Sequence, residues 1–145
     1  MFKICIRNRD TIVSTDINQK KHCPVLVDGV RTPFRRSHQA FVDLSACDLG
    51  RHALRGLIDK TGVDPGQIQH VAMGTVIHDP RTSNVARESW LSAGLPVHTP
   101  ANTVTLACIS SNVAAMQLAD MIRLGRLDAA IFGGTDTCSD PPIRV

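Results

Sequence analysis

Apolar and polar positions change their spacing several times along the chain after Pro24, and each spacing predicts one type of element. Short apolar runs are typical of buried strands, whereas apolar residues that recur three or four positions apart form one face of a helix. The apolar runs predict strands at 25–30, 68–77, 103–107 and 129–132. The stretches whose apolar residues recur three or four positions apart predict helices at 45–61, 84–93 and 110–124. This βαβαβαβ order favours right-handed crossovers and a mostly parallel sheet with helices on its faces, which is an α/β fold.

The first and third predicted helices carry the clearest local signals. Ser45 and Asp48 have the spacing of a capping box, which predicts where the first helix begins. In the third helix the polar residues Gln117, Asp120 and Arg123 are three positions apart, so the rest of its circumference is apolar. We therefore expect the third helix to be buried over most of its surface.

The first 23 residues differ from the rest of the chain in charge and polarity. Up to Arg36 there are eight basic and three acidic residues, whereas the remainder has eight and ten. Phe2, Ile4 and Ile6 alternate as in a strand, which leaves two interpretations open, an added edge strand or no structure. We expect residues 1–23 to be a basic, poorly ordered extension outside the fold, and residues 24–145 to form one domain.

Length and composition narrow the class of protein. The chain has 145 residues, about the size of one domain, and 43% of them are hydrophobic. No apolar run approaches the roughly 18 residues that span a bilayer, and the N-terminus lacks the apolar stretch of a secretory signal, so we expect a soluble, cytoplasmic protein without a transmembrane segment. Aromatic residues make up only 3%, too few for the stacking surfaces of single-strand binders, so no nucleic-acid partner is expected.

The cysteines and histidines do not predict a metal site. The five cysteines are widely spaced and include no CxxC pair, and the six histidines form no HxH or HxxxH cluster. We therefore expect no metal and no disulfide framework, and any cysteine chemistry has to come from a single thiol.

Cys108 is the cysteine best placed for such chemistry. It follows the strand predicted at 103–107 and precedes the helix predicted to begin at Ser110, and ligands of open α/β sheets gather where strands end and helices begin. The positive end of the helix favours thiolate over thiol, and the backbone N–H of Cys108 can donate to an oxyanion. The alternative is a small, buried apolar residue, and position alone does not decide between the two.

Cys47 and Cys138 are weaker candidates for a reactive thiol. Cys47 lies among polar residues in the first turn of the first predicted helix, which favours a structural or surface role. Cys138 follows a Gly-Gly turn at a strand end and could line the same cleft as Cys108, but no helix follows it, so a structural role is favoured there too.

Six short blocks carry a resemblance to a known family. They are VDGVRTPF (27–34), NVAR (84–87), AGLP (93–96), PANTV (100–104), ACISS (107–111) and GGTDTCS (133–139). In this order and spacing they resemble the N-terminal part of the thiolases, over about residues 24–145. The phrases ACIS and SDPPIR (139–144) are most similar to the branch that forms the thiolase subunit of the fatty-acid-oxidising trifunctional complex.

The resemblance implies a thiolase-like fold, here an incomplete, truncated N-terminal domain, and an acyltransferase activity. Cys108 falls on the family's nucleophile, whose thiolate attacks the 3-keto carbon of a 3-ketoacyl-CoA. Acetyl-CoA leaves, and a second coenzyme A takes the acyl group from sulfur, or the reverse condensation occurs. Coenzyme A is then a substrate, and no cofactor is expected. Ser110 and Ser111 are small enough to let substrate approach the helix, although both also suit an ordinary first turn.

The sequence also departs from the family pattern. Thr105 stands where the family often has Asn, Arg35 replaces a common Gly, and Asp136 replaces a common Glu. The family's activating His and second Cys lie in its C-terminal half, in the segments NEAF, GHP and CxGGG, and these have no counterpart in this chain. We therefore expect the isolated chain to be inactive.

Two alternatives to an active enzyme stay open. One is an inactive thiolase fragment, and the other is a coenzyme A-binding module that lacks its catalytic half. The resemblance further implies a homo-oligomer, at least a dimer, with a hydratase/dehydrogenase subunit as a possible partner.

Overall fold

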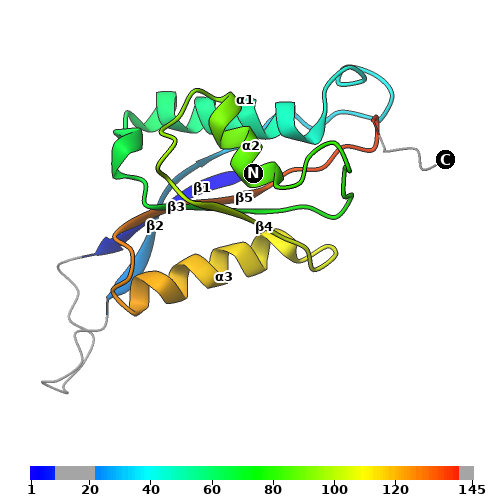
Figure 1. The fold of residues 1–145 in the computed structure, drawn as a ribbon. Coiled ribbons are helices and arrows are strands. Elements are labelled where there is room, and N and C mark those ends of the chain that lie inside the picture. The colour runs from blue at the N-terminus through cyan, green and yellow to red at the C-terminus, as the bar shows by residue number, and fades with distance from the viewer. Residues whose placement is uncertain (9–21, 141–145) are drawn as a thin grey trace, which may run out of the picture.

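The chain folds into a single sheet with helices on both of its faces (Figure 1). The structure is a computed structural model and describes residues 1–8 and 22–140. Its strands are β1 (Phe2–Asn8), β2 (Cys23–Val30), β3 (His70–Gly74), β4 (Ala101–Val104) and β5 (Ala129–Gly134). Its α-helices are α1 (Ala46–Thr61), α2 (Val85–Ser92) and α3 (Ser110–Arg123), and a short 3-10 helix covers Pro65–Gln67. Helices α1 and α2 lie on one face of the sheet and α3 lies on the other.

The sheet is mixed, with the strand order β2-β1-β5-β3-β4. β3 pairs in parallel with β4 and β5, whereas β1 pairs antiparallel with β2 and β5. Four of the five strands therefore run in the same direction and β1 alone is reversed. This architecture confirms the predicted α/β class with its mostly parallel sheet.

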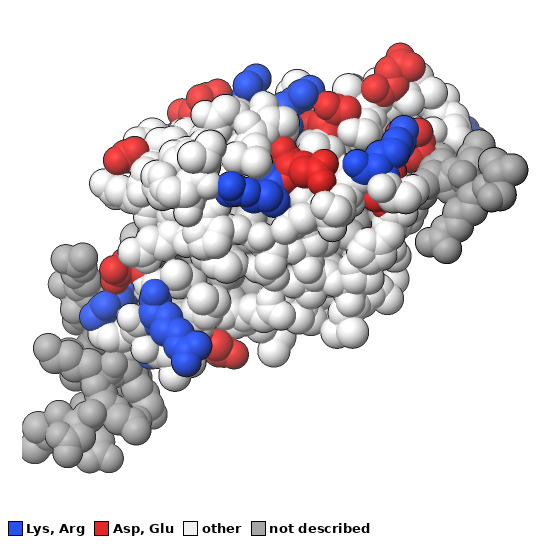
Figure 2. Space-filling model, viewed as in Figure 1, with Lys and Arg blue, Asp and Glu red and all other residues white. Residues whose placement is uncertain are grey.

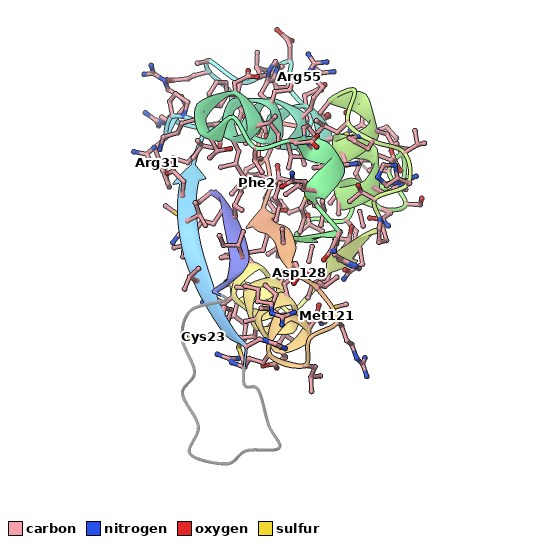
Figure 3. The ribbon with its side chains drawn as sticks, turned by 90° about the vertical axis from the view of Figure 1, so that its left-hand side faces the viewer. Phe2, Cys23, Arg31, Arg55, Met121 and Asp128 are labelled. Carbon is pink, nitrogen blue, oxygen red and sulfur yellow. The ribbon has the colours of Figure 1, made fainter. Side chains whose placement is uncertain are left out.

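The prediction for the N-terminal extension is wrong for β1. Phe2–Asn8 forms neither an edge strand nor an unstructured arm, because it lies inside the sheet between β2 and β5. The alternation of apolar residues explains its position: Phe2 and Ile4 are each only 2% exposed among the residues beneath α1 and α2, whereas Cys5 faces α3. Figure 3 shows Phe2 on the side of the sheet that carries α1 and α2.

The predicted boundary at residue 23 also divides a strand, since Cys23 already pairs with Asn8 as the first residue of β2. Residues 9–21, the rest of the predicted extension, lie outside the described residues.

Shortening a buried side chain of β1 by one methylene group tests whether this strand belongs to the core. We expect Ile4→Val to lower the free energy of unfolding by about 1 kcal/mol, because it removes a buried methylene from a closed core. The matched control is Ile109→Val, at a side chain that is 51% exposed, which should change stability by less than about 0.5 kcal/mol. Urea unfolding of both variants measures the difference, and equal values would place β1 outside the core.

The start of α1 agrees with the sequence prediction. Ser45 Oγ accepts a hydrogen bond from the Asp48 N–H at 3.1 Å, and the Asp48 side chain accepts one from the Ser45 N–H at 3.1 Å, which completes the capping box. A hydrogen bond from the Ser45 hydroxyl lowers the pKa of Asp48. The sequence therefore predicts correctly the residue at which α1 begins.

Helix α3 is less buried than its sequence pattern predicts. Only one stripe of it is buried, at Ser110, Ala114, Leu118 and Ile122. Met116 is 64% exposed and Leu124 is 68% exposed, because no element among the described residues covers the outer side of the helix. Figure 2 shows that charged side chains lie over α1 and α2 and near the C-terminal end of α3, whereas the first turns of α3 present an uncharged surface.

Candidate active site

Cys108 lies on the short connection that joins β4 to α3. The strand ends at Val104, three residues earlier than predicted, and the helix begins at Ser110. Between them the chain turns sharply, and Ala107 has a φ of 47°, in the left-handed region that a residue with a side chain rarely adopts. The turn places Cys108 on the surface of the described structure, so its thiol is accessible there.

The side chain of Ser110 holds this connection together from inside. Ser110 is buried, its Oγ accepts a hydrogen bond from the Leu106 N–H at 2.8 Å, and it donates to the Ala107 carbonyl at 2.6 Å. The backbone N–H of Ser110 also donates to the Ala107 carbonyl, at 3.2 Å. These bonds keep Ala107 in its strained conformation and so fix the direction in which Cys108 leaves the turn.

Two glycines allow the start of α3 to approach the ends of two other strands. A Cβ atom on Gly74, the last residue of β3, would overlap the backbone nitrogen of Ser111 and lie 2.6 Å from the carbonyl carbon of Ser110. A Cβ atom on Gly134, at the end of β5, would lie 3.0 Å from Cβ of Ser111. The helix start therefore rests directly on the carboxyl ends of β3 and β5, where ligands of such sheets bind.

Cys108 lines an open cleft of about 250 Å³ at this end of the sheet. Its walls include Gly74, Val76, Ser110, Ser111, Gly134 and Asp136. Within the described chain, the backbone N–H groups of Cys108, Ser111 and Asn112 donate to no acceptor. Such groups at the positive end of a helix can stabilise an anion, so the cleft combines an exposed thiol with donors for an oxyanion.

The other cysteines lie away from this cleft. Cys5 is buried in the sheet, and burial raises the pKa of its thiol. Cys47 is half-buried, and its Sγ accepts a hydrogen bond from Ser89 Oγ at 3.7 Å. Cys138 is exposed but lines a neighbouring cavity of about 450 Å³, together with Arg31, Phe34 and Arg35, so the structure does not bring it to the wall beside Cys108.

No histidine lines the Cys108 cleft in the part of the chain that the structure describes. His78, on the loop after β3, contacts the connection that carries Cys108: its Nε2 is 2.9 Å from Oγ1 of Thr105. Residues 1–8 and 22–140 contain no cluster of three or more His, Cys, Asp or Glu side chains with the geometry of a metal site. Among the same residues, no helix is both long enough and apolar enough to cross a bilayer.

Comparison with known proteins identifies the family. The model for the thiolase N-terminal domain matches residues 24–145. The chain belongs to the thiolase family. A probable 3-ketoacyl-CoA thiolase from Caenorhabditis elegans is 50% identical over 127 residues, which is 86% of this chain and 28% of that protein. The mitochondrial trifunctional enzyme subunit beta from Bos taurus is 48% identical over 120 residues, 83% of this chain and 25% of the relative.

Solved thiolase structures share the fold. The acetyl-CoA acetyltransferase of Bacillus anthracis superposes with a TM-score of 0.76 at 28% identity, over 80% of this chain and 29% of that one. The Acat5 thiolase from Ascaris suum, solved in complex with coenzyme A, also gives a TM-score of 0.76, at 26% identity over 80% of this chain and 30% of its own. The thiolase chain described here therefore spans about a quarter to a third of the length of these relatives.

Proposed function

We propose that this chain supplies the nucleophile of a thiolase that cleaves 3-ketoacyl-CoA into acyl-CoA and acetyl-CoA, or catalyses the reverse condensation. The observation that carries the proposal is the exposed Cys108 thiol in a cleft at the N-terminal end of α3. The relatives named as 3-ketoacyl-CoA thiolases support the class of substrate. Coenzyme A is a substrate in this reaction, and the proposal requires no metal or other cofactor.

The cleavage proceeds in two exchanges at sulfur. The Cys108 thiolate forms a bond to C3 of the substrate, the C2–C3 bond breaks, and its electron pair stays on C2, which takes up a proton as acetyl-CoA leaves. The thiolate of a second coenzyme A then attacks the thioester carbonyl, forms the new acyl-CoA and releases Cys108 as thiolate. Each addition places negative charge on the carbonyl oxygen, and the donor we propose for this charge is the backbone N–H of Cys108, a residue that lines the cleft.

The proton transfers require groups from outside this chain. In the thiolase pattern a His activates the nucleophile and a second Cys moves the proton at C2, and the segments that carry both are absent from residues 1–145. The open cleft, without a histidine on its described wall, supports the expectation that the isolated chain is inactive. The alternative of a coenzyme A-binding module that lacks its catalytic half stays open.

The proposal extends to assembly. Exposed Met116 and Leu124 support burial of the outer side of α3 in a larger protein. A homo-oligomer and a hydratase/dehydrogenase subunit remain the partners we propose, and the relatives named trifunctional enzyme subunit beta support association with other subunits. The cytoplasmic location stays a prediction. The relatives named trifunctional enzyme subunit beta are mitochondrial by name, so they do not support it.

A reconstitution experiment separates the enzyme from the binding module. We expect the chain alone to release no acetyl-CoA from a 3-ketoacyl-CoA and coenzyme A, and a mixture with the C-terminal part of the Caenorhabditis elegans relative to release it, measured by chromatography of the thioesters. Size-exclusion chromatography verifies that the two parts associate. A complex that binds coenzyme A but cleaves nothing would contradict the proposal and favour the binding module.

A further inference from the structure

We propose that Asp136 is a positioning residue that holds the Cys108 connection in its reactive geometry. The inference deepens the proposed function and rests on it. Asp136 follows β5 by two residues and lines the same cleft as Cys108. Its carboxylate accepts hydrogen bonds from the loop that follows β3, so the role we infer is to hold the backbone rather than to transfer protons.

The contacts of Asp136 are dense and converge on a single loop. Its Oδ1 accepts hydrogen bonds from the Ile77 N–H at 2.9 Å, from the Val76 N–H at 3.1 Å and from Thr75 Oγ1 at 3.1 Å. Its Oδ2 accepts from the same Val76 N–H at 3.0 Å. A carboxylate that accepts several N–H groups holds them more strongly than a neutral acceptor would. The exit of β3 is therefore tied to the exit of β5.

The loop held by Asp136 is in turn bonded to the connection that carries Cys108. The Thr75 N–H donates to the Val104 carbonyl at 3.1 Å, which joins the loop to the last residue of β4. The Thr75 carbonyl lies 3.4 Å from Oγ of Ser110, the side chain that supports the turn at Ala107. A path of polar contacts thus runs from Asp136 through Thr75 to Val104 and Ser110, which precede and follow Cys108 in the chain.

This path explains how a strained turn remains in one conformation. A left-handed φ at Ala107 is maintained only where its surroundings over-determine it, and Thr75 and Ser110 supply that constraint. Loss of the Asp136 carboxylate would leave the N–H groups of Val76 and Ile77 without their acceptor and loosen the support of the turn. Cys108, which lines the cleft, would then lose its fixed position at the start of α3.

Substitutions of Asp136, read by alkylation of the intact chain with iodoacetamide, test the inference. Peptide mass spectrometry reports the rate at Cys108, and Cys23 on β2 serves as an internal reference because it is partly exposed and does not line the Cys108 cleft. We expect Asp136→Ala to slow Cys108 alkylation at neutral pH about tenfold, because the thiol loses its fixed position. The rate at Cys23 should not change.

Two conservative variants separate hydrogen bonding from charge. Asp136→Asn keeps the oxygen that accepts three of the four bonds, and Asp136→Glu keeps the carboxylate, so both should restore the Cys108 rate to within about threefold of the original chain. The matched control is Asp64→Ala, which removes a carboxylate that accepts the Gly66 N–H at 2.9 Å in a distant loop and should leave Cys108 unaffected. An Asn variant as slow as the Ala variant would overturn the positioning role.

A second variant keeps the test decisive if Asp136→Ala does not fold. Thr75→Val removes only the hydroxyl donor at 3.1 Å, and we expect it to slow Cys108 alkylation about threefold. Unchanged Cys108 rates in folded Asp136→Ala or in Thr75→Val overturn the inference while leaving the proposed function intact. If replacement of Cys108 by serine leaves thiolytic cleavage undiminished in a protein that contains both catalytic halves, the proposed function fails instead.

Discussion

Replacement of Cys108 by serine should abolish acyl transfer in a full-length protein that contains this chain. We expect the rate of thiolytic cleavage to fall by at least about 10³-fold, because a covalent mechanism loses its nucleophile. Thiols ionise near pH 8.5 in general, whereas a serine hydroxyl stays protonated over the working range. Because Cys108 is exposed, the exchange of sulfur for oxygen should leave the free energy of unfolding within about 0.5 kcal/mol of its original value.

The assay requires both catalytic halves. A suitable protein is a chimera in which this chain replaces the matching part of the Caenorhabditis elegans relative, with which it shares 50% identity over 127 residues. Acetyl-CoA release gives the rate, and intact-mass measurement after rapid mixing with substrate detects the acylated protein. Cys138→Ser is the matched control, since this cysteine is also exposed but lies outside the cleft. Undiminished turnover in the Cys108→Ser chimera would show that the nucleophile has been misidentified.

The sequence was sufficient for the parts of the fold that depend on local signals. The capping box at Ser45 predicts the start of α1, and the change from an apolar run to a helical period predicts the switch from β4 to α3. It also places Cys108 at that switch, which is how a single exposed thiol becomes a candidate before any contact is known. These inferences hold because capping and periodicity are properties of a few neighbouring residues.

The features that sequence reasoning missed depend on contacts between distant segments. The strand Phe2–Asn8 pairs with Cys23–Val30 and Ala129–Gly134, which are distant in the chain or come later in it. The alternation of its apolar residues predicts a strand but not its place inside the sheet. The period of α3 indicates which positions are apolar but not which of them another element covers. The role inferred for Asp136 depends on a loop about sixty residues earlier in the chain. That Asp136 stands where the family commonly has Glu does not reveal this contact.

The second large effect is expected from a single methyl group at the junction of β3 and α3. Gly74→Ala places a Cβ atom against the backbone of Ser111 and 2.6 Å from the carbonyl carbon of Ser110, a contact that no side-chain rotation relieves. We expect a loss of at least about 2 kcal/mol in the free energy of unfolding, because the helix start has to move as a unit. The same movement should displace Cys108 and slow its alkylation relative to Cys138.

At a second glycine, the same substitution to alanine is expected to have the opposite effect on the free energy of unfolding. Gly56 lies within α1, and a Cβ atom there would meet no atom within 4 Å. Gly56→Ala should therefore stabilise the chain by up to about 1 kcal/mol, through the higher helix propensity of alanine, without changing the reactivity of Cys108. Urea unfolding and cysteine labelling of the two variants measure both effects together. If Gly74→Ala is as stable as Gly56→Ala, then α3 does not rest on the end of β3, and the geometry that places the thiol is wrong.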